Sequence, residues 1–287
     1  MISTSWGAAS DVGLTRAHNE DALFAQFPMF LVADGMGGHA AGEVASGIAK
    51  RELGALATEE VLTIDRISET IQRANEAIVT ASESADELRG MGTTVVGITL
   101  VEDRKQELWL VFNLGDSRLY RLFNGELELV TTDHSEVQEL VDVGAISASD
   151  AKHHAHRNVI TRALGLAAAV EPDFWLLPPV PGERFLLCSD GLTTEVEDDL
   201  IASLLGSEEN PTVAAFRLVE QAVSSGGRDN VTVVVIDVVA SGGAGEVDTA
   251  NRGRVPVMNV PLSEASPTEK DTRTTPELID EVPRAND

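Results

Sequence analysis

The clearest periodic pattern of apolar residues begins after Thr63, where they recur at every third or fourth position. The apolar positions are Ile64, Ile67, Ile71, Ala74 and Ile78. This spacing places them on one face of an α-helix. Thr63 precedes them as an N-cap residue would, with a side chain able to accept a hydrogen bond from the first turn. The pattern predicts an amphipathic helix that begins at residue 64.

Other helices are predicted from composition and from residues typical of helix starts. Residues 42–60 are rich in alanine. Ser135 and Gln138 form a capping-box pattern ahead of an apolar run. Asn210 followed by Pro211 is typical of an N-cap and the first helical position. We expect helices over 42–60, after 135, over 197–205 and after 210.

Strand-like runs separated by turn residues fill most of the rest up to residue 239. Asn124-Gly125, between two such runs, is a strong signal for a two-residue hairpin. Strands come in groups with helices in pairs between them, which favours antiparallel sheets and an α+β fold. Residues 144–160 are polar and without a period, so a surface flap is expected there. The expected strands are 3–13, 22–27, 31–33, 93–101, 108–114, 119–123, 126–131, 174–180, 185–188 and 231–239.

The composition changes near residue 240. Residues 240–287 contain no aromatic residue and five of the chain's eleven prolines, and serine, threonine and acidic residues fill much of the rest. Such a segment buries too little apolar surface to order itself. We expect one domain over 1–239, followed by a disordered acidic tail over 240–287.

Charge and cysteine content narrow the classes of function. The formal net charge is -26 and the pI is about 4.4, so the surface repels phosphate backbones and attracts divalent cations. Charge-driven binding to nucleic acid is therefore excluded. Cys188 is the only cysteine, so no intrachain disulfide can form. The chain begins without signal-peptide features, and no apolar run reaches the length of a membrane span. The expected location is the cytoplasm.

Four aspartates stand beside apolar runs and glycines. Asp34, Asp116 and Asp190 each follow an apolar run, and Asp229 precedes one. In an antiparallel sheet the start of one strand lies beside the end of its neighbour, so one sheet edge is expected to gather all four. Carboxylates beside bare backbone carbonyls suit Mg2+ or Mn2+. The alternative for each Asp-Gly pair is an ordinary turn.

Eight motifs follow one another along the chain: TRAHNED, VADGMGGHAAGE, GMGTTVVG, NLGDSRLYR, TTDHS, HRNVITRALG, CSDGL and GGRDNVTVVVI. Together, in this order, they resemble the motifs of the metal-dependent protein phosphatases of the PPM (type 2C) family, in its bacterial form. The resemblance covers residues 1–239. It implies a four-layer α-β-β-α sandwich, in which helices flank two central antiparallel sheets. It also implies hydrolysis of phosphoserine and phosphothreonine in proteins, with two Mg2+ or Mn2+ ions at one end of the sandwich.

The resemblance also assigns metal ligands. Asp34 would bridge the two ions, and the carbonyl of Gly35 would bind the first. Asp190 and Asp229 would hold the second. Many bacterial members bind a third ion, for which Asp116 and Asp190 would be the ligands. A water shared by the ions would be the nucleophile, because metal ions lower the pKa of bound water.

Three residues near the N-terminus complete the implied site. Glu20 and Asp21 would reach the metal ions through water. Arg16 would bind phosphate oxygens with its planar guanidinium group. The alternatives are a solvated pair of acids and an ordinary surface arginine.

The group that protonates the leaving alcohol is left open. Eukaryotic members often carry a histidine directly after the Asp-Gly, where this chain has Met36. His39 is the candidate for this catalytic role, His134 ranks behind it, and a metal-bound water is the other option. Cys188 has apolar flanks and lacks the glycine-rich loop of cysteine phosphatases, which indicates a packed core thiol.

Three functions are weighed. The first is an active, monomeric phosphatase that acts on proteins phosphorylated by serine/threonine kinases. The second is a phosphatase-like regulatory binding module without turnover, but degenerate members of this kind usually lose a metal-binding aspartate. The third is a phosphohydrolase for small phosphate esters, for which the polar flap offers no obvious pocket.

Overall fold

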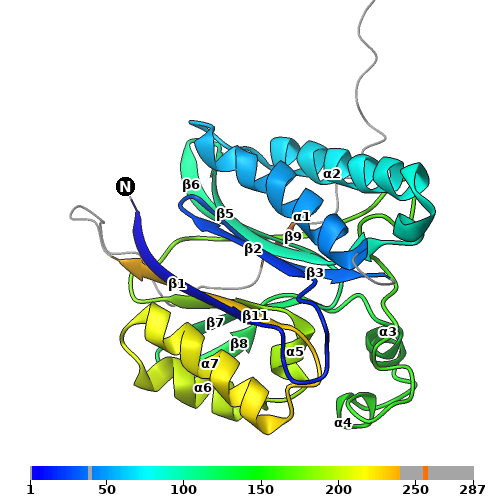
Figure 1. The fold of residues 1–287 in the computed structure, drawn as a ribbon. Coiled ribbons are helices and arrows are strands. Elements are labelled where there is room, and N and C mark those ends of the chain that lie inside the picture. Colours follow the sequence, from blue (N-terminus) through cyan, green and yellow to red (C-terminus); the bar gives the residue numbers. More distant parts are fainter. Residues whose placement is uncertain (1, 38–40, 240–254, 258–287) are drawn as a thin grey trace, which may run out of the picture.

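Two antiparallel β-sheets lie face to face in this computed structural model, which describes residues 2–37, 41–239 and 255–257 (Figure 1). The five-stranded sheet has the order β1-β11-β10-β7-β8. Its strands are β1 (Ser3–Asp11), β7 (Arg118–Phe123), β8 (Glu126–Leu129), β10 (Arg184–Cys188) and β11 (Val231–Val239).

The second sheet has seven strands in the order β12-β9-β6-β5-β3-β2, and the short strand β4 pairs with β3. Every pairing in both sheets is antiparallel. The strands are β2 (Asp21–Gln26), β3 (Met29–Met36), β4 (Gly92–Thr93), β5 (Val95–Asp103), β6 (Gln106–Leu114), β9 (Asp173–Leu177) and β12 (Val255–Val257).

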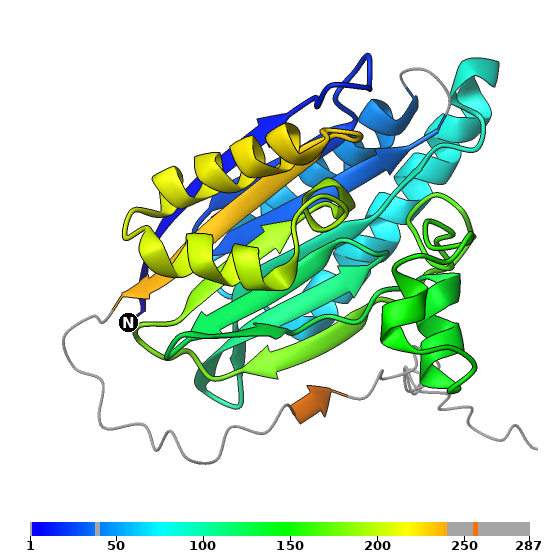
Figure 2. The ribbon, with the colours of Figure 1, turned by 90° about the horizontal axis from the view of Figure 1, so that it is seen from below.

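Helices cover the outer faces of both sheets, so the expected four-layer α-β-β-α sandwich is confirmed (Figures 1 and 2). α1 and α2 pack on the seven-stranded sheet, and α6 and α7 pack on the five-stranded sheet. No helix among the described residues is long and apolar enough to cross a membrane. The helices are α1 (Ala41–Gly54), α2 (Ile64–Ser84), α3 (Glu136–Asp142), α4 (Ala148–Ala151), α5 (Asp190–Thr193), α6 (Asp198–Ser207) and α7 (Pro211–Ser225), with 3-10 turns η1 (Ala55–Thr58) and η2 (Asp86–Leu88).

Apolar side chains from the two sheets meet in a central core. Phe30 of β3, Trp109 of β6 and Phe185 of β10 are completely buried there. The rings of Trp109 and Phe185 pack edge to face across the two sheets, with centroids 6.2 Å apart. This core holds the sheets in register and so sets where their ends meet.

Local sequence signals account for most of the elements. Oγ1 of Thr63 accepts a hydrogen bond from the backbone N–H of Arg66, which confirms the predicted cap of α2. Asn210 caps α7 in the same way, with Pro211 in the first turn. Asn124 and Gly125 both have positive φ and join β7 to β8, as the hairpin signal predicts.

Three elements differ from expectation. The alanine-rich helix ends at Gly54 and continues only as the turn η1; a Cβ at Gly54 would lie 2.7 Å from the ring of Phe24. The expected flap contains the short helix α4, which is closed by a capping box between Ser147 and Asp150. β3 does not end before Asp34 but runs through it to Met36, because β2 and β4 pair with this part of the strand.

The expected tail falls mainly outside the described residues. Within it, only Val255–Val257 is described. This segment forms β12, which pairs with β9 at the edge of the seven-stranded sheet and places Pro256 opposite Trp175.

Candidate metal centre

The five-stranded sheet brings Asp190 and Asp229 together. β10 and β11 are antiparallel neighbours, with Cys188 opposite Val233. Asp190 lies just past the end of β10, at the first position of α5, and Asp229 lies just before β11. The end of one strand and the start of the next therefore place both carboxylates at one end of the sandwich.

The seven-stranded sheet supplies the other acids. Asp34 of β3 lies directly opposite Asp21 of β2. Asp116 lies in the connection from β6 to β7, where the chain crosses from one sheet to the other. The expectation that one edge of a single sheet gathers the four aspartates is therefore wrong. The acids come from both sheets, and the face-to-face packing of the sheets brings them together.

These carboxylates lie close enough to disturb one another's ionisation. Burial raises the pKa of Asp34 well above its ordinary value, and the charges of Asp21, Asp190, Asp116 and Asp229 raise it further. Burial, and then charge repulsion within the cluster, raise the pKa of Asp21 to about 7, of Asp116 to about 8 and of Asp190 to about 6. The described surroundings therefore do not stabilise the fully ionised form of the cluster at neutral pH.

Two carboxylate oxygens of this region have no partner. Oε1 of Glu20 and Oδ1 of Asp21 are buried without a hydrogen bond among the described residues. Buried polar atoms in proteins are normally paired, so each points to a missing donor. Waters bound to a metal ion are donors of this kind.

The residues present fit divalent cations. Hard cations such as Mg2+ and Mn2+ take oxygen ligands, and their charge offsets the repulsion within the cluster. Among residues 2–37 and 41–239, no three Asp, Glu, His or Cys side chains are yet arranged to hold one ion together. The fit therefore rests on the chemistry of the cluster and on its unpaired oxygens.

At Gly35 the backbone of two neighbouring segments leaves no room for a side chain. A Cβ there would lie 2.2 Å from the carbonyl oxygen of Gly42 and 2.6 Å from that of Glu20. The close approach seats the start of α1 against β3 beside Asp34. Thr94 holds the backbone of Asp34 from the other side, because the two residues exchange hydrogen bonds of 2.9 and 3.1 Å.

Ser189 and Asn230 connect the acidic segments. Oγ of Ser189 donates to Oδ2 of Asp21 at 2.8 Å and accepts the N–H of Thr232 at 2.9 Å. Oδ1 of Asn230 accepts the N–H of Glu20 at 2.8 Å. The amide of Asn230 also donates to carbonyls of the β1–β2 loop. The sequence alone does not single out Ser189, because only the pairing of β10 with β11 brings it beside Thr232.

Arg16 lies at the rim of the cluster. Its Nη2 donates to Oδ2 of Asp229 at 2.7 Å, and its side chain is 49% exposed. Burial lowers the pKa of Arg16, but the charge of Asp229 and the hydrogen bond to it raise this pKa, and the net shift is upward. The guanidinium thus stands where it can neutralise an anion beside the acidic cluster.

The two histidine candidates have different outcomes. His39 lies outside the described residues. His134 is buried, and both ring nitrogens are engaged: Nδ1 accepts the N–H of Gly115 at 3.1 Å, and Nε2 lies 3.1 Å from Oδ2 of Asp173. Since Nδ1 is an acceptor, Nε2 carries the proton and donates it to Asp173. His134 therefore holds the turn that carries Asp116, and its ring is not free to protonate a leaving group.

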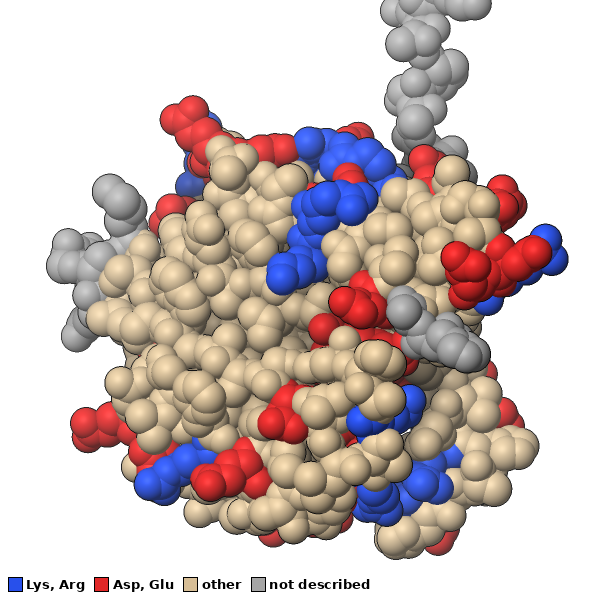
Figure 3. All heavy atoms as spheres, in the orientation of Figure 1, with Lys and Arg blue, Asp and Glu red and all other residues tan. Residues whose placement is uncertain are grey.

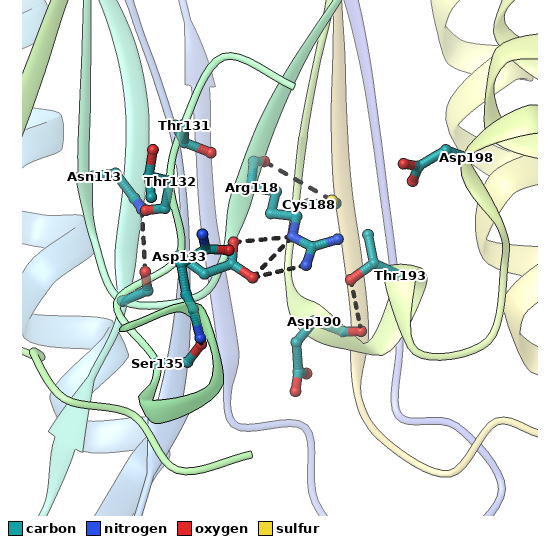
Figure 4. A network of polar contacts seen from close by, with 12 residues as sticks. Asn113, Arg118, Thr131, Thr132, Asp133, Ser135, Cys188, Asp190, Thr193 and Asp198 are labelled. Carbon is teal, nitrogen blue, oxygen red and sulfur yellow. Dashed lines mark hydrogen bonds and ion pairs between the residues drawn. The ribbon is translucent and has the colours of Figure 1, made fainter. Parts of the chain in front are cut away.

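Arg118 supplies positive charge behind the cluster (Figure 4). Its guanidinium group forms a two-pronged ion pair with Asp133, with Nε–Oδ1 and Nη2–Oδ2 distances of 2.9 and 2.7 Å. The charge of Arg118 partly counters the rise in the pKa of Asp116 and Asp190. The sequence motif NLGDSRLYR contains Arg118, but nothing in the motif alone indicates this role.

Cys188 is a core thiol, as the sequence indicated. It is completely buried, and its Sγ donates to the carbonyl of Arg118 at 3.8 Å. Burial raises the pKa of this thiol to about 12. A thiol of this kind is not ionised at neutral pH and is a poor nucleophile.

Replacing Cys188 by alanine is expected to leave hydrolysis within about twofold of wild type, because catalysis requires no thiolate in this site. Rates for a phosphothreonine peptide before and after treatment with iodoacetamide give a second measurement. A hundredfold loss of the hydrolysis rate in a folded C188A protein would instead indicate that Cys188 takes part in catalysis.

Comparison with known proteins gives one consistent result. The family model "Protein phosphatase 2C" matches residues 15–225. The serine/threonine protein phosphatase PstP of Mycobacterium tuberculosis is 44% identical over 238 residues, which are 82% of this chain and 45% of the relative. The serine/threonine phosphatase stp of Listeria monocytogenes is 40% identical over 239 residues, or 79% of this chain and 93% of the relative. The chain thus spans less than half the length of the mycobacterial relative.

Solved structures agree. A crystal structure of M. tuberculosis PstP/Ppp has a TM-score of 0.78 at 39% identity and covers 84% of this chain and 100% of that one. A structure of the catalytic domain of PstP in complex with two manganese ions has a TM-score of 0.77, with the same identity and coverage.

Proposed function

Because this chain belongs to the protein phosphatase 2C family, we propose that it hydrolyses phosphoserine and phosphothreonine in proteins at a centre of two divalent cations. One observation carries the proposal: acids from both sheets converge at one end of the sandwich without enough positive charge among the described residues to balance them. The two manganese ions in the complex of the PstP catalytic domain support the same number of ions here.

The residues have distinct tasks in this proposal. Asp34 would be shared by both cations, the carbonyl of Gly35 would hold the first, and Asp190 and Asp229 would hold the second. Bound cations supply a nucleophile by lowering the pKa of water, and they offset charge on the phosphoryl oxygens. Glu20 and Asp21 would accept hydrogen bonds from waters bound to the cations, through the two oxygens that lack partners among the described residues.

Further details belong to the proposal as well. A third ion is assigned to Asp116 and Asp190, and Mn2+ or Mg2+ is the metal. The substrates are proteins phosphorylated by serine/threonine kinases, the protein acts as a monomer, and the single free cysteine suits the reducing cytoplasm. His39 remains the proposed proton donor to the leaving alcohol.

The first test compares the hydrolysis of two substrates: p-nitrophenyl phosphate, which is a small phosphate ester, and a phosphothreonine peptide. Each is measured with Mn2+, with Mg2+ and with excess chelator. Metal-dependent hydrolysis of the peptide supports the proposal. A clear preference for the small ester would move the substrate class to small molecules. A folded, metal-loaded protein without turnover would instead indicate a regulatory binding module.

Arg16→Ala is expected to raise KM for the phosphothreonine peptide by about tenfold, because a charge-assisted pair with phosphate contributes about 1.5–3 kcal/mol when partly shielded from water. The Mn2+ concentration for half-maximal activity should not rise in R16A. Arg16 donates a hydrogen bond to Asp229, so its removal leaves this carboxylate free to bind the metal. Arg16→Lys is the matched control, which keeps the charge and loses the planar fork. Unchanged kinetics in R16A would remove Arg16 from the substrate site.

A further inference from the structure

Glu195 is a partly buried residue outside the acidic cluster, and its carboxylate is shielded from solvent. Its side chain is 2% exposed, and it follows α5, the helix that begins with Asp190. Three hydrogen bonds reach it from Arg228. Nε donates to Oε1 at 2.8 Å, Nη2 donates to Oε2 at 2.9 Å, and the backbone N–H donates to Oε1 at 3.1 Å. Such two-pronged, charge-assisted contacts define geometry as well as energy.

Arg228 stands directly before Asp229 in the loop between α7 and β11. Glu195 also contacts this loop at its first residue, because a Cβ on Gly226 would lie 2.5 Å from Oε2. Gly227 has φ of 54°, a left-handed conformation that favours glycine. Glu195 therefore contacts the loop on both sides of Gly227, at Gly226 and at Arg228, which directly precedes Asp229.

The same two segments meet again at Gly191. A Cβ there would lie 2.0 Å from the carbonyl oxygen of Asn230, so α5 and the start of β11 lie side by side (Figure 1). One segment carries Asp190 and the other carries Asp229. Their spacing decides whether both carboxylates can reach one ion.

We propose that Glu195 is a positioning residue for Asp229: by holding Arg228 it fixes the loop 226–229 so that Asp229 stands beside Asp190 as a metal ligand. The inference rests on the proposed function, since it takes Asp229 as a ligand. Carboxylates that hold ligand-bearing groups in place typically influence metal affinity by about 10- to 100-fold. Glu195 acts in this way through the backbone and side chain of Arg228.

Glu197 offers a matched control on the same segment. It also pairs with a cation, with Oε2 2.5 Å from Nζ of Lys152, but both side chains are largely exposed. Glu195→Ala, Glu195→Gln and Glu197→Gln are therefore compared with wild type. Mn2+ binding is measured by calorimetry on the full chain, beside the Mn2+ dependence of phosphopeptide hydrolysis and thermal unfolding in chelator.

Glu195→Ala is expected to weaken Mn2+ binding by about tenfold, and the loss of metal affinity should exceed the loss of kcat at saturating Mn2+. Glu195→Gln should weaken binding less, because its amide oxygen still accepts the N–H of Arg228. Glu197→Gln should bind Mn2+ as wild type does. Glu195→Gln carries the test if Glu195→Ala does not fold.

Two results would overturn the inference. The first is wild-type Mn2+ affinity in a folded Glu195→Ala protein. The second is equal weakening in Glu197→Gln, which would indicate a general effect of removing negative charge. If wild type binds Mn2+ but hydrolyses no phosphopeptide, the proposed function fails, while calorimetry still decides the role of Glu195.

Discussion

Replacing Asp34 by asparagine is expected to lower kcat for a phosphothreonine peptide by about 1,000-fold, which corresponds to about 4 kcal/mol in the activation barrier. Asp34 is the acid whose ionisation responds to all four of its acidic neighbours, so it lies where the segments from both sheets converge. An amide at this position keeps the shape but loses the charge that a bridging ligand needs. Steady-state kinetics with saturating Mn2+ provide the measurement.

Stability gives the control for D34N. The pKa of Asp34 is raised on folding, so the folded protein holds this proton more tightly than the unfolded chain does. Stability is therefore lost as the pH rises above the ordinary pKa of aspartate, and asparagine removes that loss. In chelator at pH 8, D34N should unfold at a higher temperature than wild type. A D34N protein with near-normal turnover would refute the assignment of Asp34 as a bridging ligand.

Removing the metal is expected to have an equally large and reversible effect. Excess chelator should lower hydrolysis by at least about 1,000-fold, because none of the described side chains of the site replaces the activated water. Mn2+ should also stabilise the folded protein, by about 2.7 kcal/mol when it is present at about 100 times its dissociation constant. Thermal unfolding with and without Mn2+ measures this effect, and activity should return when the metal is restored.

The matched experiment repeats the Mn2+ titration on D34N. There the shift in unfolding temperature should shrink, because the shared ligand is missing. Activity that persists in chelator, after dialysis and with no metal detectable in the protein, would contradict a metal-dependent mechanism. A shift in unfolding temperature as large in D34N as in wild type would place the Mn2+ at another site.

Signals that act over a few residues predicted their elements well. The cap at Thr63, the Asn124-Gly125 turn and the Asn210-Pro211 start each involve groups within one helical turn or one hairpin, and the structure confirms all three. The last strand of the domain, β11, has the predicted bounds. In these segments local geometry and burial favour the same secondary structure.

Contacts between segments that are distant in the chain could not be predicted from the sequence. Asp34 was expected past the end of its strand, but the partner strands β2 and β4 continue β3 beyond it. The acids were expected along one sheet, whereas the crossing from β6 to β7 and the stacking of two sheets unite them. Ser189, His134 and Glu195 contact partners that lie between 19 and 168 residues away in the chain. No periodicity or spacing encodes such contacts.

Charge on the visible surface differs from charge at the centre. One face carries its lysines, arginines and acids in separate small groups around a broad area with none (Figure 3). Exposed charges of this kind are screened by water and salt, so they affect stability little. The partly shielded acids at the end of the sandwich are screened far less.

The acidic cluster makes the amount of folded protein in the cell depend on the supply of divalent cations. Without cations the folded form holds protons on carboxyl groups that would be ionised in the unfolded chain. This lowers the stability of the folded form at neutral pH, so a larger fraction of molecules is unfolded at any moment. Proteases act on that fraction, and a change of about 1–2 kcal/mol in stability can alter abundance several-fold. Under metal starvation, cells are expected to lose the protein itself as well as its activity, so that phosphorylated substrates persist until new protein has been synthesised.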